Sequence, residues 1–171
     1  KRKYLTPMMN AHKITAEFEK ALCEYCCSPY AVAVDNCSNA LFLALYYELQ
    51  VKDYHKHDTT DGLVCKPYIT IPKHTYPSVA CEIIHAGGMV QFEDGVFSNR
   101  VLGLVSGPYQ LKPTNVYDSA LRFTSNMYLP GTHMCLSFTG PYKHLKLGKG
   151  GAILTDDLQA ALWFKRARFS G

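Results

Sequence analysis

The spacing of apolar residues predicts a helix near the start of the chain. Ile14, Phe18 and Leu22 recur every four residues, which places them on one face of a helix. Thr15 is the predicted N-cap, and the helix is expected to end at Cys27, before a Ser-Pro pair. The chain therefore opens with an amphipathic helix that needs a hydrophobic partner surface.

Further along, short apolar or β-branched runs alternate with helical patterns. Strands are predicted at residues 30–34, 67–71, 89–92, 101–105, 115–117, 132–138 and 151–154, and helices at 40–50, 77–86 and 158–165. Residues 51–66 are polar and predict a surface loop. This order predicts an α/β domain with a mostly parallel sheet, and the strand–turn–strand at 132–154 makes the sheet mixed.

Length and composition fit one domain, residues 1–171, because 47% of the 171 residues are apolar. The most apolar stretch, 40–47, is far shorter than the ~18 residues that a membrane span needs. The first ten residues lack a signal-peptide core, so we expect no membrane partner and a cytoplasmic protein. The last residues form no turn or cap, so we expect that residues are missing after Gly171; a short natural domain is the alternative.

Net charge and cysteine content say less about the function than the pattern of predicted elements does. The net charge of +4 is scattered, and it suits a phosphate-bearing small molecule as well as nucleic acid. The seven cysteines, an odd number, argue against a disulfide framework and for a reducing compartment. Cys23-x-x-Cys26 is half of a zinc motif inside a helical pattern, so we expect core thiols and no metal site.

Four junctions between predicted elements carry side chains that can bind a ligand or take part in catalysis. The strand-to-helix turn at Asn36 and Ser38 is either an anion site or a simple helix cap. Tyr76 follows a strand at the edge where ligands bind in open α/β sheets, or it packs over a helix end. Asp118 is either a cap or a site carboxylate. Lys143 lies in a long glycine-rich turn with room for a flat ligand.

The four junctions, taken together, resemble one family. They match, in order, the motifs of the DegT/StrS-type sugar aminotransferases, which are pyridoxal-phosphate enzymes of fold type I. The matching segments are Ala31–Leu45 (AVAVDNCSNALFLAL), Pro72–Ser78 (PKHTYPS), Asn115–Ala120 (NVYDSA) and Ser137–Asp157 (SFTGPYKHLKLGKGGAILTDD).

The resemblance implies a three-layer α/β sandwich, the large domain of fold type I. It implies that pyridoxal 5′-phosphate is bound and that Lys143 is its Schiff-base lysine. Asp118 would pair with the pyridine nitrogen, and Tyr76 would stack on the ring. The phosphate would lie against Cys37, Ser38 and Asn39, with a hydroxyl from Ser137.

The implied activity is transfer of an amino group from an amino acid to a nucleotide-linked keto-sugar, by a homodimer whose partner chain completes the phosphate site. The alternative is a reduced relative or partner subunit that binds pyridoxal phosphate or a nucleotide sugar without turnover; the shortened middle, Leu121 and the missing C-terminal domain favour it. The sequence also departs from the family pattern before the lysine. One extra residue separates Phe138 from Lys143, so a forward count reaches Tyr142 instead. Leu121 replaces a Gln or His, and a strand–helix unit between Asp94 and Asp118 is missing.

The small C-terminal domain of the family is also absent or reduced.

A third, unrelated hypothesis is a phosphate- or nucleic-acid-binding module that uses the basic residues Lys143, His144, Lys146 and Lys149. Nucleic-acid grooves combine basic residues with stacking aromatics, and only Tyr142 accompanies these. We therefore expect no nucleic-acid partner.

Overall fold

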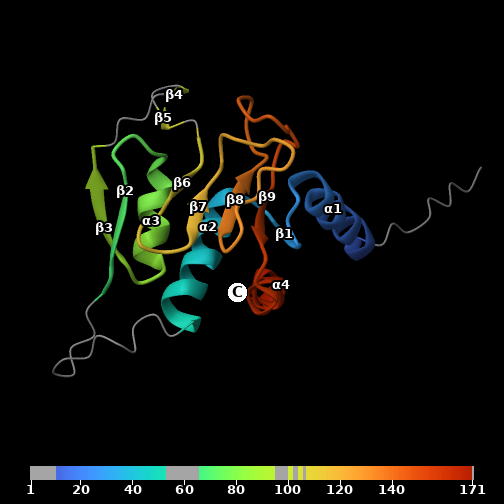
Figure 1. Ribbon diagram of the computed structural model, residues 1–171, viewed down its shortest axis with the longest axis horizontal. Coiled ribbons are helices and arrows are strands. Elements are labelled where there is room, and N and C mark those ends of the chain that lie inside the picture. The colour runs from blue at the N-terminus through green and yellow to red at the C-terminus, as the bar shows by residue number, and fades with distance from the viewer. Residues whose placement is uncertain (1–10, 53–65, 95–99, 102–103, 106, 171) are drawn as a thin grey trace, which may run out of the picture.

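The computed structural model describes residues 11–52, 66–94, 100–101, 104–105 and 107–170 (Figure 1). The helices are α1 (Ala11–Cys26), α2 (Cys37–Tyr46), the π-helical turn η1 (Tyr47–Val51), α3 (Pro77–His85) and α4 (Leu158–Ser170). The strands are β1 (Tyr30–Val34), β2 (Tyr68–Pro72), β3 (Met89–Glu93), β4 (Arg100–Val101), β5 (Leu104–Val105), β6 (Tyr109–Gln110), β7 (Val116–Asp118), β8 (His133–Ser137) and β9 (Gly151–Thr155).

The main sheet has the strand order β1-β9-β8-β7-β6, and β2 and β3 form a parallel pair beside it. An antiparallel bridge between Thr70 of β2 and Lys112, just after β6, joins the two groups. Strands β1, β2, β3, β7 and β8 run in one direction, while β6 and β9 run in the other. The predicted mixed and mostly parallel sheet is thereby confirmed.

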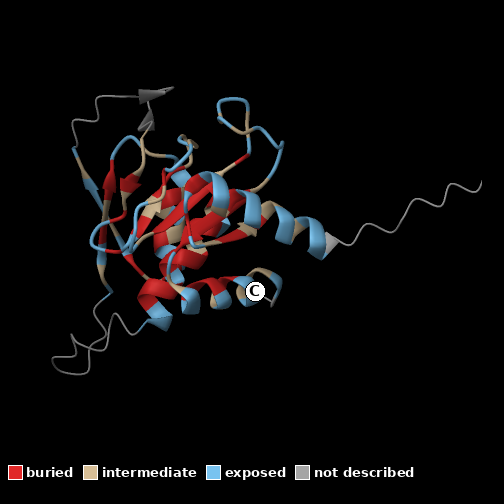
Figure 2. Cartoon of the chain, turned by 45° about the vertical axis from the view of Figure 1, so that its right-hand side comes forward, coloured by how far each residue is buried: buried red, intermediate tan, exposed pale blue. Residues whose placement is uncertain are grey.

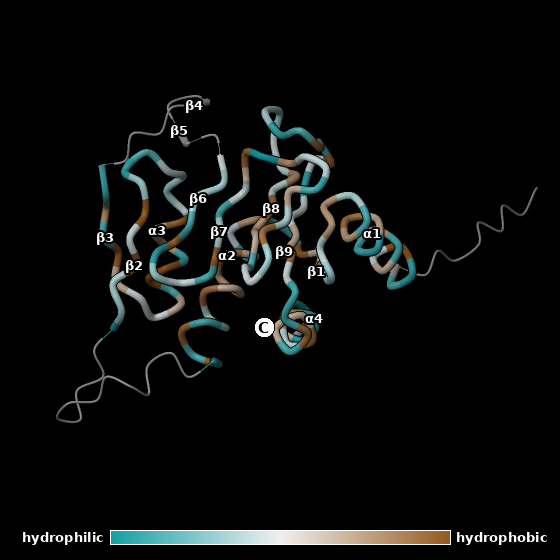
Figure 3. The backbone as a smooth tube through the Cα atoms, in the orientation of Figure 1, coloured by the Kyte–Doolittle hydropathy of each residue, from teal (hydrophilic) through white to brown (hydrophobic). Residues whose placement is uncertain are grey.

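Side-chain alternation along the central strands builds a core on each face of the sheet. In β8, Met134 and Leu136 pack in a cluster with Leu22 of α1, whereas Cys135 packs in a second cluster with α2, α3 and α4. Buried residues gather in the strands and in the helix faces turned toward them (Figure 2). Hydrophobic segments follow β2 and the central strands, and hydrophilic ones dominate the loops (Figure 3). The predicted three-layer sandwich is confirmed.

Several element boundaries differ from the prediction. Helix α1 begins at Ala11, so Thr15 lies inside the helix and the predicted cap there was wrong. Helix α2 begins at Cys37 rather than at residue 40, because the side chain of Asn36 accepts a hydrogen bond from the Asn39 N–H and caps it. Most of the predicted loop 51–66 lies outside the described residues.

The segment between β3 and β7 departs most from the prediction. The single strand expected at 101–105 is wrong: β4 and β5 are two short antiparallel strands, and β6 was not predicted. Within the described part of 94–115 there is no helix. Strand β6 pairs with β7, and Lys112 just after β6 forms the bridge to β2.

None of the described helices has both the length and the apolar character needed to cross a bilayer.

Candidate functional site

The predicted site residues converge on a cavity of about 460 Å³. It lies where β7 and β8 end and where α2 and α3 begin. Its lining includes all but one of the residues expected to hold a cofactor: Cys37, Ser38, Tyr76, Asp118, Ser137 and Lys143. Because these residues come from segments more than a hundred positions apart, the fold itself assembles the site.

Asp118 is a buried carboxylate at the end of β7, and only 5% of its surface is exposed. Its Oδ1 accepts a hydrogen bond from the Ala120 N–H at 2.8 Å, and its Oδ2 accepts one from the Tyr109 hydroxyl at 2.7 Å. Burial raises the pKa of Asp118, while these two hydrogen bonds and the Lys143 ammonium act to lower it. The carboxylate is held in one orientation beside the cavity.

Lys143 reaches the cavity from the long turn between β8 and β9. Its Nζ donates to the Ala120 carbonyl at 2.7 Å, directly after the Asp118 loop. The turn is closed at its base, where the Phe138 N–H donates to the Gly150 carbonyl at 2.9 Å. Farther out, His144 Nδ1 accepts from the Phe123 N–H at 3.2 Å. The extra residue before Lys143 therefore does not keep its amine out of the cavity.

The environment of Lys143 favours a neutral amine more than solvent does. Burial lowers its pKa, and the nearby Cys37 and Asp118 act in the opposite direction. A lowered pKa leaves more unprotonated amine, which is the nucleophilic form. Lys146 and Lys149 of the same turn are exposed, so of these three lysines only Lys143 combines partial burial with the cavity.

The N-termini of α2 and α3 face each other across one side of the cavity. Ser38 near the start of α2 donates from Oγ to the Ser78 Oγ of α3 at 2.8 Å. Both helices present N–H groups at their first turns, which favours an anion there. Gly151 of β9 lies directly against the backbone of Asn36 and Cys37, where α2 begins.

Tyr76 and Ser137 come to the cavity from two different elements. Tyr76 is the residue before α3 and is 62% exposed. Ser137 is the last residue of β8 and is half-buried. Both line the cavity, so an aromatic face and a hydroxyl are available to a ligand within it.

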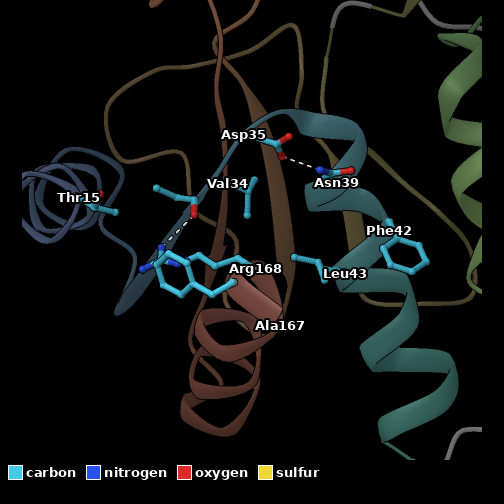
Figure 4. Close-up of a pocket in the computed structure, with 10 residues that line it drawn as sticks. Thr15, Val34, Asp35, Asn39, Phe42, Leu43, Ala167 and Arg168 are labelled. Atoms are coloured by element: carbon cyan, nitrogen blue, oxygen red, sulfur yellow. Dashed lines mark hydrogen bonds between the residues drawn. The ribbon is translucent and has the colours of Figure 1, made fainter. Parts of the chain in front are cut away.

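Asn39 is the predicted residue that the structure does not bring into this cavity. Its N–H is bound by the Asn36 side chain, and its amide nitrogen donates to Asp35 Oδ1 at 2.6 Å. Asn39 instead lines a second cavity of about 600 Å³ between β1, α2 and α4, where Arg168 donates to the Ala33 carbonyl (Figure 4). That cavity contains neither Lys143 nor Asp118.

The lining residues that escaped prediction include Thr75, Ser78 and Tyr109. Thr75 and Ser78 lie inside the segment that was recognised around Tyr76, so their position was available from the sequence. Tyr109 had no such signal, because β6 has only two residues and no periodicity.

Comparisons with known proteins agree on the fold. Residues 7–96, just over half of the chain, match the sequence model of the DegT/DnrJ/EryC1/StrS aminotransferase family. A comparison with curated protein sequences gave no significant match. The structure is similar to a sugar aminotransferase from Micromonospora echinospora, at 17% identity and a TM-score of 0.68, over 92% of this chain and 50% of that one.

Two further solved structures are similar. One is the Helicobacter pylori aminotransferase involved in the biosynthesis of pseudoaminic acid, at 14% identity and a TM-score of 0.62, over 88% of this chain and 46% of that one. The other is a GDP-4-keto-6-deoxymannose-3-dehydratase mutant with bound GDP-perosamine, at 16% identity and a TM-score of 0.60, over 87% of this chain and 45% of that one. The chain thus spans half or less of the length of these structures.

Proposed function

Because the chain belongs to the DegT/DnrJ/EryC1/StrS aminotransferase family, we propose that its cavity holds pyridoxal 5′-phosphate. We propose further that the protein transfers an amino group from an amino acid to a nucleotide-linked keto-sugar. The observation that carries this proposal is the Lys143 amine beside the buried carboxylate of Asp118, next to two helix N-termini.

The lining residues suit the three parts of the cofactor. A cavity of about 460 Å³ lies within the range of small-molecule sites. A buried carboxylate suits a pyridinium nitrogen, and helix N–H groups suit a phosphate dianion. A flat tyrosine face suits a flat ring. The set contains one group of the right chemistry for each part.

When bound, the cofactor supplies an electron sink for amino-group transfer. Lys143 would hold it covalently through Nζ and would later carry a proton at the same atom. Asp118 would accept a hydrogen bond from the ring nitrogen and keep that nitrogen protonated. Ser38 and Ser137 would donate to the phosphate, and Tyr76 would cover the ring and limit access of water.

Borohydride reduction tests the covalent part of this proposal. Protein incubated with pyridoxal phosphate should turn yellow, and reduction should remove the colour and leave a phosphopyridoxyl group on the peptide that contains Lys143, as read by mass spectrometry. Lys143→Ala should stay colourless. Lys146→Ala, in the same turn but exposed, should behave as the native chain. A colourless native chain, or label on Lys146, would contradict the proposal.

A second candidate is a relative that binds the cofactor or a nucleotide sugar without transamination. The absence of a helix in the described part of 94–115 favours it. Adding glutamate separates the two: a competent aminotransferase loses its colour as the amino group moves to the cofactor, and a mere binder keeps it. A homodimer in the cytoplasm is part of the main proposal, and sedimentation of the purified chain tests the dimer.

A further inference from the structure

Strand β6 places a tyrosine opposite the site carboxylate. In the antiparallel pair of β6 and β7, Tyr109 is the register partner of Asp118. Side chains of directly paired residues point to the same face of a sheet, so the register alone brings the phenol to the carboxylate. The Tyr109 hydroxyl donates to Asp118 Oδ2 at 2.7 Å, and the tyrosine is 9% exposed.

The hydrogen bonds around Tyr109 have only one consistent direction. A phenol has a single proton, and an ionised carboxylate can only accept. The Tyr109 proton is therefore used by Asp118, and the Thr75 hydroxyl, which is also hydrogen-bonded to Tyr109, must be the donor of that second bond. A directed chain runs from Thr75 through Tyr109 to Asp118. It connects the segment before α3 with the end of β7.

We propose that Tyr109 is a positioning residue that keeps Asp118 ionised and aimed into the cavity. Its phenol occupies one lone pair of Oδ2 and the Ala120 N–H occupies one of Oδ1, which leaves each oxygen a lone pair for a cationic N–H donor. Without the phenol, a buried carboxylate takes up a proton more readily, and a protonated carboxyl cannot hold a proton on a ligand nitrogen.

Other groups around Asp118 do not supply the same hydrogen bond. Lys143 acts on it through charge, and its amine is used by the Ala120 carbonyl. The thiols of Cys37 on α2 and Cys135 on β8 are buried, and burial and the Asp118 charge raise their pKa values, so they stay neutral. Tyr109 is the side chain that hydrogen-bonds Asp118 among the described residues.

The first test needs no cofactor. The midpoint of Asp118 is followed by carbon NMR of the labelled carboxyl in the apo protein, with Asp118→Asn to assign the signal. In Tyr109→Phe the pKa of Asp118 should rise, because the only group removed is the donor that stabilises the charged form. Tyr117→Phe is the matched control: its hydroxyl contacts Gln110 at 3.4 Å and it neighbours Asp118 in β7. An unchanged midpoint in Tyr109→Phe overturns the inference.

A second test rests on the proposed function and uses 4′-deoxypyridoxine 5′-phosphate, which has the ring nitrogen and phosphate but cannot react with Lys143. Tyr109→Phe should bind it about tenfold more weakly, with the acid limb of the affinity–pH profile displaced to higher pH, whereas Tyr117→Phe should bind within about twofold of the native chain. Equal affinities and profiles for both variants and the native chain overturn the inference.

The two tests separate the two claims. A native chain that binds no analogue refutes the proposed cofactor, and the NMR midpoint still decides the role of Tyr109. A third variant, Thr75→Val, removes the donor to Tyr109 while keeping the phenol. It should raise the pKa of Asp118 less than Tyr109→Phe does, and an equal or larger rise would overturn the directed chain.

Discussion

Gly151 is the position where adding one carbon atom should disturb the site most. A Cβ at this residue would lie 2.6 Å from the Asn36 carbonyl carbon, 2.7 Å from its oxygen and 2.8 Å from the Cys37 nitrogen. Ordinary van der Waals contact for such a carbon begins at 3.4 Å, so the closest atom must move by about 0.8 Å. All three atoms are backbone, and no rotamer change can relieve the contact.

The cost of Gly151→Ala should be that of an overpacked core, about 1–3 kcal/mol in the free energy of unfolding. For a chain of this size each kcal/mol lowers Tm by about 2–4 °C. Because Asn36 and Cys37 begin α2, the movement also displaces the helix N-terminus that borders the cavity. We therefore expect weaker binding of pyridoxal phosphate as well as a less stable fold.

Urea unfolding of Gly151→Ala, followed by circular dichroism, measures the first effect. Gly107→Ala is the matched control, because a Cβ there meets no atom within 4 Å. The control should unfold with the native chain, and Gly151→Ala should unfold at clearly lower urea with the same slope. If both variants unfold within about 0.5 kcal/mol of the native chain, β9 does not fix the start of α2 and the reasoning fails.

Two buried ionic groups give further predictions. Although burial raises the pKa of Glu48, hydrogen bonds from His133 and Lys52 hold it below the ordinary 4.5, so its contribution to stability is present above pH 4.5 and is lost as pH falls through the lowered pKa. Urea unfolding as a function of pH should lose this acid-side component in Glu48→Gln, and an unchanged pH profile would contradict it. Arg168 pairs with the buried Glu19, and its own side chain is 14% exposed, so Arg168→Met should cost about 3 kcal/mol by leaving Glu19 short of a partner. Lys165→Met should cost less than about 1 kcal/mol because that lysine is 46% exposed, and equal losses would refute the distinction.

The local sequence was sufficient to predict an element wherever its own residues carry a strand, cap or helix-start pattern. The β-branched run 30–34 became β1 with unchanged bounds, and Pro77 begins α3 as expected of proline in a first helical turn. At Asn36 the sequence left a cap and an anion site open, and the cap is present. The four motifs bring Asp118 and Lys143 to one cavity because each motif includes the end of a strand.

Contacts between distant segments could not be predicted in the same way. Glu48 and His133 are 85 positions apart and meet at 3.3 Å only because η1 packs beside β8. The π-helical turn itself continues from α2 within the helix predicted at 40–50. Thr15 was assigned as a cap because threonine favours that position, yet the helix extends past it to Ala11. Tyr109 depends on a strand pairing that no local pattern encodes.

Segment 109–112 joins two parts of the fold that border the cavity. Thr75 and Tyr76 belong to the β2–α3–β3 segment, whereas Asp118 and Lys143 belong to the β7–β8–β9 segment, so the cavity lies between two segments that share one core cluster. In the described residues the strands of the two segments are joined by one bridge, between Thr70 and Lys112. The Lys112 side chain also forms an ion pair with Glu93 at 3.1 Å. A ligand that contacts both segments would stabilise their packing. The free energy of unfolding should therefore rise with the concentration of a ligand that binds in this cavity.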